Sequence, residues 1–103
     1  MTNSIAEIEN AKCIFIIGSN TSEAHPLIGS RILKAKEKGA KLIVADPRRI
    51  QLSFYADMYV RHQLGTDVAL INGIMNVILK EGWHDRKFVE ERTEGFKEFQ
   101  KVV

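Results

Sequence analysis

Three short polar segments hold the residue types that could do chemistry in this chain, and each follows an apolar or partly apolar stretch. They are Gly18–His25, Asp46–Arg49 and Gly65–Asp67. Glycine lets a backbone come close to a ligand, and hydroxyl and amide groups form hydrogen bonds with it. Arginine pairs with phosphate oxygens. Together these residue types favour a site for a phosphate group or a nucleotide.

The stretch Ile14–Pro26 shows how such a site could be built. A short apolar run ends at Gly18, small or polar residues follow, and Pro26 stands just ahead of a helical pattern. A strand that ends in such a loop and leads into a helix offers an anion free N–H groups and the positive end of a helix dipole. An ordinary strand-to-helix turn has the same pattern, so this stretch alone leaves both interpretations open.

The other two segments also have two readings each. Asp46 stands where a ribose-binding acid would lie, and Arg48 and Arg49 could pair with phosphate. Asp67 could accept two hydrogen bonds from a purine edge, such as the N1–H and N2 amino group of guanine. In the simpler readings, Asp46 forms a turn before Pro47, Asp67 caps a helix and the arginines are solvated. The expected placement of all three segments at one sheet edge favours the nucleotide site.

The strands that precede the three polar segments determine where these segments lie. The apolar runs Cys13–Ile17 and Lys41–Ala45 predict two strands of a parallel sheet, covered on both faces. A helix from about Pro26 or Leu27 to Lys38 connects them, and Met58–His62 predicts a short third strand near the sheet edge. Ligands of open parallel sheets lie outside the carboxyl ends of the strands. The three polar segments are therefore expected to meet there.

The remaining segments predict further helices. Val68 to Glu81 is apolar over more than half of its circumference, so we expect it to be buried on two sides. Shorter helices are predicted at Ile5–Asn10 with a Ser4/Glu7 capping box, at Leu52–Ala56 as a helical turn, at Arg86–Arg92 after Asp85, and at Glu94–Val102. The element order is that of one α/β domain over residues 1–103, with helices on both faces of a parallel sheet.

Composition narrows the class of protein. The 45% hydrophobic and 27% charged fractions of the 103 residues are those of a soluble globular chain. The net charge of +2 is too small and dispersed to predict a nucleic-acid partner. Cys13, the single cysteine, is expected to be a core residue and fits a reducing compartment. No apolar run approaches the roughly 20 residues of a membrane span. We therefore expect a cytoplasmic protein without membrane insertion.

Familiar catalytic and metal motifs are missing from the sequence. Neither the G-x-G-x-x-G nor the Walker pattern occurs, which argues against a standard nicotinamide site and an ATPase. His25, His62 and His84 lack the spacing of metal ligands. The residues themselves therefore predict no catalytic group and no metal site in this chain.

Four segments together resemble a known family. Ile17–Pro26, Val44–Arg49 and Gly65–Leu70 resemble, in this order, motifs of the molybdopterin oxidoreductases of the dimethyl sulfoxide reductase superfamily. The ending Phe88–Phe96 is similar to that of the catalytic alpha subunits of formate dehydrogenases. The resemblance covers nearly the whole chain but only a small part of such a subunit. It implies that the chain is an excised piece.

The resemblance implies a Rossmann-like, three-layer α/β/α domain that holds one arm of bis-molybdopterin guanine dinucleotide with molybdenum or tungsten. Carried over by motif, the resemblance assigns three groups of residues. The phosphate and guanosine region would be lined by Gly18, Ser19, Asn20 and Glu23. The ribose would lie beside Ala45, Asp46, Pro47, Arg48 and Arg49, and the guanine end would be completed by Gly65, Thr66 and Asp67. In this assignment Asp67 reads the purine.

The sequence also departs from the family pattern. Gln63 and Leu64 stand where the family often has Arg-Pro, which changes the rigidity of the loop. Several functional residues of the family have no counterpart here: the metal-ligating cysteine or selenocysteine, its neighbouring histidine, the catalytic arginine and the iron–sulfur cysteines. Cys13 matches none of them. The isolated chain is therefore expected to be inactive.

The resemblance implies a whole enzyme that oxidises formate to carbon dioxide. The partners would be the remaining domains of the alpha subunit and an electron-transfer iron–sulfur subunit. An iron–sulfur cluster would lie outside this chain. Two alternatives stay open: a stand-alone nucleotide-binding α/β module, and a structural interaction domain without a ligand.

Overall fold

A three-stranded parallel sheet is the centre of the first part of the chain. The computed structural model describes residues 3–103. Strands β1 (Cys13–Ile17), β2 (Lys41–Ala45) and β3 (Met58–Val60) lie in the order β1-β2-β3. Phe15 pairs with Ile43, and Ile43 pairs with Met58 on its other side. The bounds predicted for the first two strands are confirmed, and the third strand is two residues shorter than predicted.

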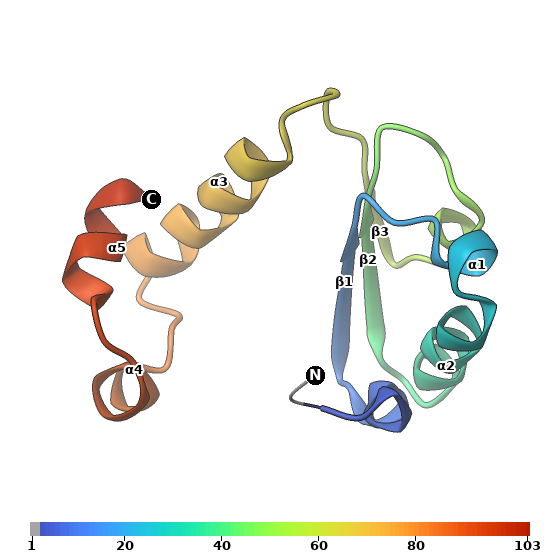
Figure 1. Cartoon of the computed structure of the whole chain (residues 1–103), viewed down its shortest axis with the longest axis horizontal. Helices are drawn as coiled ribbons and strands as arrows, with labels where there is room; N and C mark the ends of the chain where they lie inside the picture. The colour runs from blue at the N-terminus through green and yellow to red at the C-terminus, as the bar shows by residue number, and fades with distance from the viewer. Residues whose placement is uncertain (1–2) are drawn as a thin grey trace. The chain divides into compact units, whose positions relative to one another are not determined.

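Packing divides the chain into two compact units, Met1–Leu64 and Gly65–Val103. The first unit holds the sheet, and the second holds only helices (Figure 1). Each unit is described by itself below. The assignment of residues 1–103 to one domain stays a prediction.

Helices of the first unit follow the predicted order with one addition. The 3₁₀ helix η1 (Ile5–Asn10) precedes β1, α2 (Pro26–Glu37) connects β1 with β2, and the 3₁₀ helix η2 (Gln51–Phe54) precedes β3. Ser4 N donates to Glu7 Oε2 at 2.8 Å, as the predicted capping box requires. A short helix, α1 (Thr21–Ala24), lies inside the segment that was predicted to be a loop (Figure 1).

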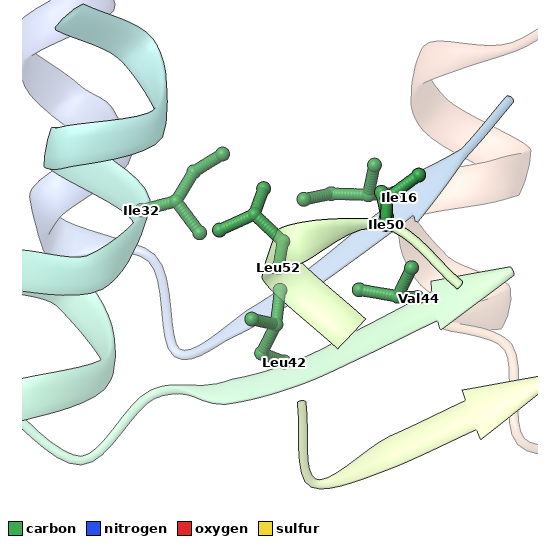
Figure 2. Packing of buried hydrophobic residues seen from close by; sticks show 6 residues of the cluster. All are labelled: Ile16, Ile32, Leu42, Val44, Ile50 and Leu52. Atoms are coloured by element: carbon green, nitrogen blue, oxygen red, sulfur yellow. The ribbon is translucent and has the colours of Figure 1, made fainter. Parts of the chain in front are cut away.

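The hydrophobic core lies on the face of the sheet that α2 and η2 cover. Figure 2 shows its six buried side chains, which come from β1, α2, β2, η2 and the residue just before η2: Ile16, Ile32, Leu42, Val44, Ile50 and Leu52. Alternation along β2 sends Leu42 and Val44 to this same face. The core thus joins the sheet to the crossover helix, and the carboxyl ends of β1 and β2 project from this packed base.

The opposite face of the sheet is the main departure from prediction. Cys13 is exposed and Phe15 is 42% exposed, although both were expected to lie in a strand covered on both faces. These side chains alternate with core residues, so they point to the face that no helix among the described residues of the first unit covers. The prediction of Cys13 as a core residue is therefore wrong within this structure.

The second unit consists of α3 (Asp67–Lys80), α4 (Arg86–Arg92) and α5 (Phe96–Val102). Asp85 caps α4, because its Oδ1 accepts a hydrogen bond from Phe88 N at 3.0 Å. The last helix was predicted to begin at Glu94. It begins at Phe96 instead, because Gly95 has a φ of 72° and serves as its N-cap.

Burial of α3 on two sides was predicted and is not observed. No residue of α3 is buried in the described structure, and Val68 is 72% exposed. The second unit has only two short helices to offer as packing partners, so the apolar side chains of α3 stay half-buried or exposed. One contact does join α3 to the end of the chain: Asn76 Nδ2 donates to Val103 O at 2.7 Å. No helix in residues 3–103 is both long and apolar enough to cross a membrane.

Candidate functional site

The loops that leave β1 and β2 lie beside each other. Gly18 N, just after β1, donates to Ala45 O at the end of β2, 3.2 Å away. Gly18 has a φ of +63°, a left-handed conformation that glycine adopts without steric cost. The structure therefore brings together the first two of the three predicted polar segments, at the carboxyl edge of the sheet.

A pair of hydroxyl groups organises the first loop. Ser19 Oγ and Thr21 Oγ1 lie 2.9 Å apart, and Thr21 is only 6% exposed. Thr21 begins α1, so its hydroxyl ties the short helix to the residue that follows Gly18. Sequence reasoning missed both α1 and this contact. The signal that could have found the helix is Asn20 followed three residues later by Glu23, a spacing typical of helix starts.

Asn20 contributes an unsatisfied acceptor to the first loop. Its main-chain oxygen accepts from Glu23 N at 3.1 Å and from Ala24 N at 3.0 Å. Its side-chain Oδ1 is buried and has no hydrogen-bond partner among the described residues. Buried polar atoms are normally paired, and an unpaired one costs free energy. A donor from a bound ligand could satisfy this oxygen once the loop adjusts to admit it.

Asp46 shapes the second loop through its own side chain. It is 5% exposed, and its Oδ1 accepts from Arg48 N at 2.8 Å. This bond is the turn-forming role that the simpler reading gave to Asp46. Pro47 is half-buried in the turn, while Arg48 and Arg49 are exposed, so both guanidinium groups can reach a ligand from solvent.

Side chains of β3 and of the residue just after it form hydrogen bonds to the second loop, which follows the neighbouring strand β2. Tyr59 Oη donates to Asp46 O at 3.0 Å, and Arg61 Nε donates to Pro47 O at 3.1 Å. Asp46 N in turn donates to Val60 O at 3.0 Å. The main chain of this loop is thus fixed by three hydrogen bonds to β3 and the residue that follows it.

Arg49 lies against two aromatic rings. Its Cζ is 4.6 Å from the centroid of the Phe54 ring and 5.9 Å from that of the Tyr59 ring. Sequence reasoning assigned no role to Tyr59 or Arg61. Their spacing of two along the predicted strand Met58–His62 places both side chains on one face, but it does not indicate that this face meets the loop after β2.

The third segment belongs to the second unit. Gly65 has a φ of +76°, Thr66 is the N-cap of α3, and Asp67 is the first residue of that helix. Asp67 is exposed. The N-cap position belongs to Thr66 and not to Asp67, which instead places a carboxylate in the first turn, where the helix dipole favours negative charge. The meeting of this segment with the first two loops stays a prediction.

The first two loops offer the groups that an anionic, hydrogen-bonding ligand requires. Gly18 removes the steric barrier to close approach, Ser19 and Asn20 supply polar groups, and two exposed guanidinium groups supply positive charge. Within residues 3–103, no three His, Cys, Asp or Glu side chains gather closely enough to hold a metal ion. These groups can bind and orient a phosphate-bearing molecule.

Comparison with known proteins finds relatives that match the whole chain. The F420-dependent formate dehydrogenase subunit alpha of Methanocaldococcus jannaschii is 54% identical over 103 residues, which are 100% of this chain and 15% of that protein. Formate dehydrogenase H of Escherichia coli is 42% identical over 103 residues, covering 100% of this chain and 14% of that protein. The chain thus spans about 15% of the length of the curated relatives it matches.

A solved structure shares the fold. Acetylene hydratase from Pelobacter acetylenicus superposes with a TM-score of 0.82 at 31% identity, over 95% of this chain and 15% of that one. The family model described as molybdopterin oxidoreductase matches residues 1–97, which is nearly the whole sequence. On this evidence, the chain belongs to the molybdopterin oxidoreductase family.

Proposed function

We propose that this chain is the cofactor-binding part of a formate dehydrogenase alpha subunit, holding a guanine dinucleotide arm of bis-molybdopterin guanine dinucleotide. The observation that carries the proposal is the match, over all 103 residues, to relatives that are formate dehydrogenase subunits. The hydrogen bond between Gly18 N and Ala45 O supports it, because it joins two of the three loops at one edge of the sheet.

The first two loops fit such a ligand by their chemistry. Gly18, Ser19, Asn20 and Glu23 would line the phosphate and guanosine region, and the unpaired Oδ1 of Asn20 is an acceptor that a ligand donor would satisfy. Asp46 would face the ribose with Ala45 and Pro47 beside it. Arg48 and Arg49 would balance the charge of the phosphates.

The third loop would recognise the base. The carboxylate of Asp67 would accept hydrogen bonds from N1–H and the N2 amino group of guanine, which adenine does not offer in that arrangement. Gly65 and Thr66 would bring the backbone close to the base. Asp67 is therefore the residue on which guanine specificity depends in this proposal.

A second helical layer would complete the fold. The uncovered face of the sheet carries Cys13, Phe15 and Met58, and Met58 is 56% exposed. Burial of such a face stabilises a domain by roughly 25 cal/mol per Å² of apolar surface. A covering layer would give the Rossmann-like, three-layer α/β/α arrangement that parallel sheets favour.

In the whole enzyme this chain would bind and orient, and other groups would react. When bound, the molybdenum or tungsten of the cofactor would supply the two-electron chemistry by which formate becomes carbon dioxide. The remaining domains of the alpha subunit and an iron–sulfur subunit would be the partners, with an iron–sulfur cluster outside this chain. The enzyme would be cytoplasmic, and the 103-residue chain alone would be inactive.

Titration of the isotope-labelled chain with GDP, followed by NMR, tests the proposal. We expect amide shifts at residues 18–23, 46–48 and 65–67, and weaker binding by Asp67→Ala. Asp85→Ala is the matched control, because it also removes a carboxylate at a helix N-terminus but lies outside the proposed site. If only helix capping matters, the two variants will bind GDP equally.

The same titration separates the alternatives. Equal shifts with ADP and GDP would indicate a general nucleotide-binding module and contradict guanine recognition by Asp67. No shifts at millimolar concentrations of either nucleotide would contradict nucleotide binding by this chain and favour a structural interaction domain.

A further inference from the structure

Arg49 is held by aromatic rings from two different elements. Phe54 is the last residue of η2 and Tyr59 lies in the middle of β3. The Phe54 ring centroid is 4.6 Å from Arg49 Cζ, and the side chain is 67% exposed, so this ring is outside the core. A guanidinium group over an aromatic face is attracted by the electrons of the ring. The contact therefore orders an arginine that would otherwise move freely in solvent.

The Tyr59 side chain contacts both the main chain of the second loop and Arg49, the last residue of that loop. Its hydroxyl donates to Asp46 O at 3.0 Å, and its ring centroid is 5.9 Å from Arg49 Cζ. Arg49 is thus positioned relative to the same turn that carries Asp46 and Arg48. Because one side chain makes both contacts, the guanidinium and the turn are held in a fixed relation.

We propose that Phe54 and Tyr59 are positioning residues, which hold the guanidinium of Arg49 ready to bind a phosphate group. The proposal rests on the proposed function and names the group that the second loop binds. A guanidinium group carries five N–H donors in one plane, so contact of its Cζ with a ring leaves donors to which phosphate oxygens can bind. Ordering the side chain before binding also reduces the entropy that binding would cost.

Two probes separate the phosphate contact from guanine recognition. Inorganic pyrophosphate and guanosine are titrated separately into the full 103-residue chain, and GDP is titrated as the combined ligand. Pyrophosphate is expected to shift the side-chain Nε–Hε signal of Arg49, whereas guanosine is expected to leave it in place. Since each probe carries only one part of the nucleotide, failure of the phosphate site and failure of the guanine site give different results.

Phe54→Leu keeps an apolar side chain but removes the aromatic face. We expect its affinity for pyrophosphate and GDP to fall roughly two- to fivefold, which corresponds to ~0.5–1 kcal/mol for an exposed cation–π contact. Its affinity for guanosine should stay unchanged. Phe54→Trp, which retains an aromatic face, should restore the affinity for pyrophosphate.

Tyr55→Leu is the matched control. Tyr55 follows Phe54 directly and is 48% exposed, but its ring is not one of the two against which Arg49 lies. The proposal is wrong if Phe54→Leu and Tyr55→Leu bind pyrophosphate equally, or if Phe54→Leu weakens guanosine as much as GDP. It is also wrong if pyrophosphate leaves the Arg49 signal unchanged in the parent chain. In that last case, a guanosine response at residues 65–67 would still support the proposed function.

Discussion

Tyr59 donates its hydroxyl to the main-chain oxygen of Asp46 at 3.0 Å, and this bond links the third strand to the loop that follows the second. The two residues are 13 positions apart in sequence, yet they shape one turn. A loop held in this way loses little conformational freedom when a ligand binds. The bond is therefore a feature of the fold that also prepares the candidate site.

Tyr59→Phe removes this hydroxyl and keeps the ring. We expect the free energy of unfolding to fall by roughly 0.5–1.5 kcal/mol, because the partly buried Asp46 oxygen loses a donor. Urea denaturation followed by circular dichroism measures the change. Tyr55→Phe removes an exposed hydroxyl nearby and should change stability by less than roughly 0.5 kcal/mol. Equal effects of the two variants would show that the bond to Asp46 contributes nothing.

Gly18→Ala tests the conformation of the first loop. Gly18 has a φ of +63°, and a residue with a Cβ pays roughly 1–2 kcal/mol in this left-handed region. The variant should be destabilised by about that amount in urea denaturation, and its affinity for GDP should fall as the loop shifts. Gly73→Ala is the control, because Gly73 lies within α3 and an added Cβ meets no atom within 4 Å. That change should be neutral or stabilising, since alanine favours helix. Retention of both stability and GDP affinity by Gly18→Ala would contradict the prediction.

Leu52→Ala tests whether η2 anchors the segment between β2 and β3. Leu52 is 0% exposed and belongs to the core cluster. Truncation of a buried leucine typically costs roughly 2–5 kcal/mol, so the variant should unfold at a much lower urea concentration. Leu27→Ala removes the same atoms from a side chain that is 81% exposed, and should change stability by less than roughly 0.5 kcal/mol. Similar midpoints for the two variants would contradict the burial described here.

Sequence reasoning located β1 and β2 because both are continuous apolar runs with clear ends. Gly18 stops the first run, and Asp46 with Pro47 stops the second. Such local signals do not depend on tertiary contacts, so they predict well where a strand ends. The mixed α/β class with a small parallel sheet followed from the same runs and is confirmed.

Burial was predicted less well, because it depends on partners outside the segment itself. The apolar character of Cys13–Ile17 indicates what the strand can bury, whereas its exposure depends on which elements cover it. The same reason applies to α3, whose apolar side chains find few partners within the second unit. Contacts of the candidate site were missed for a related reason. Tyr59 reaches Asp46 only through strand pairing, and no local spacing encodes that contact.

Asp57 joins the sheet to the crossover helix. Its Oδ2 accepts from Leu42 N at 2.8 Å and from Lys36 Nζ at 3.1 Å. The bond from the Leu42 amide, and then the bond from Lys36, hold the pKa of the Asp57 carboxyl below its ordinary value. Both bonds favour the ionised form, because the carboxylate accepts from each donor.

The stabilising effect of Asp57 is therefore expected to depend on pH. A carboxyl group with a lowered folded-state pKa contributes stability above its unfolded pKa of about 3.9, and this contribution is lost as the pH falls through the folded pKa. Asp57→Asn should reduce the free energy of unfolding at about pH 7, and the difference from the parent chain should shrink towards about pH 3. Urea denaturation at both pH values measures it, with Glu37→Gln as the control for the change in net charge. A constant difference across this range would show that ionisation of Asp57 does not stabilise the fold, whereas convergence would assign the loss to the bonds from Leu42 and Lys36.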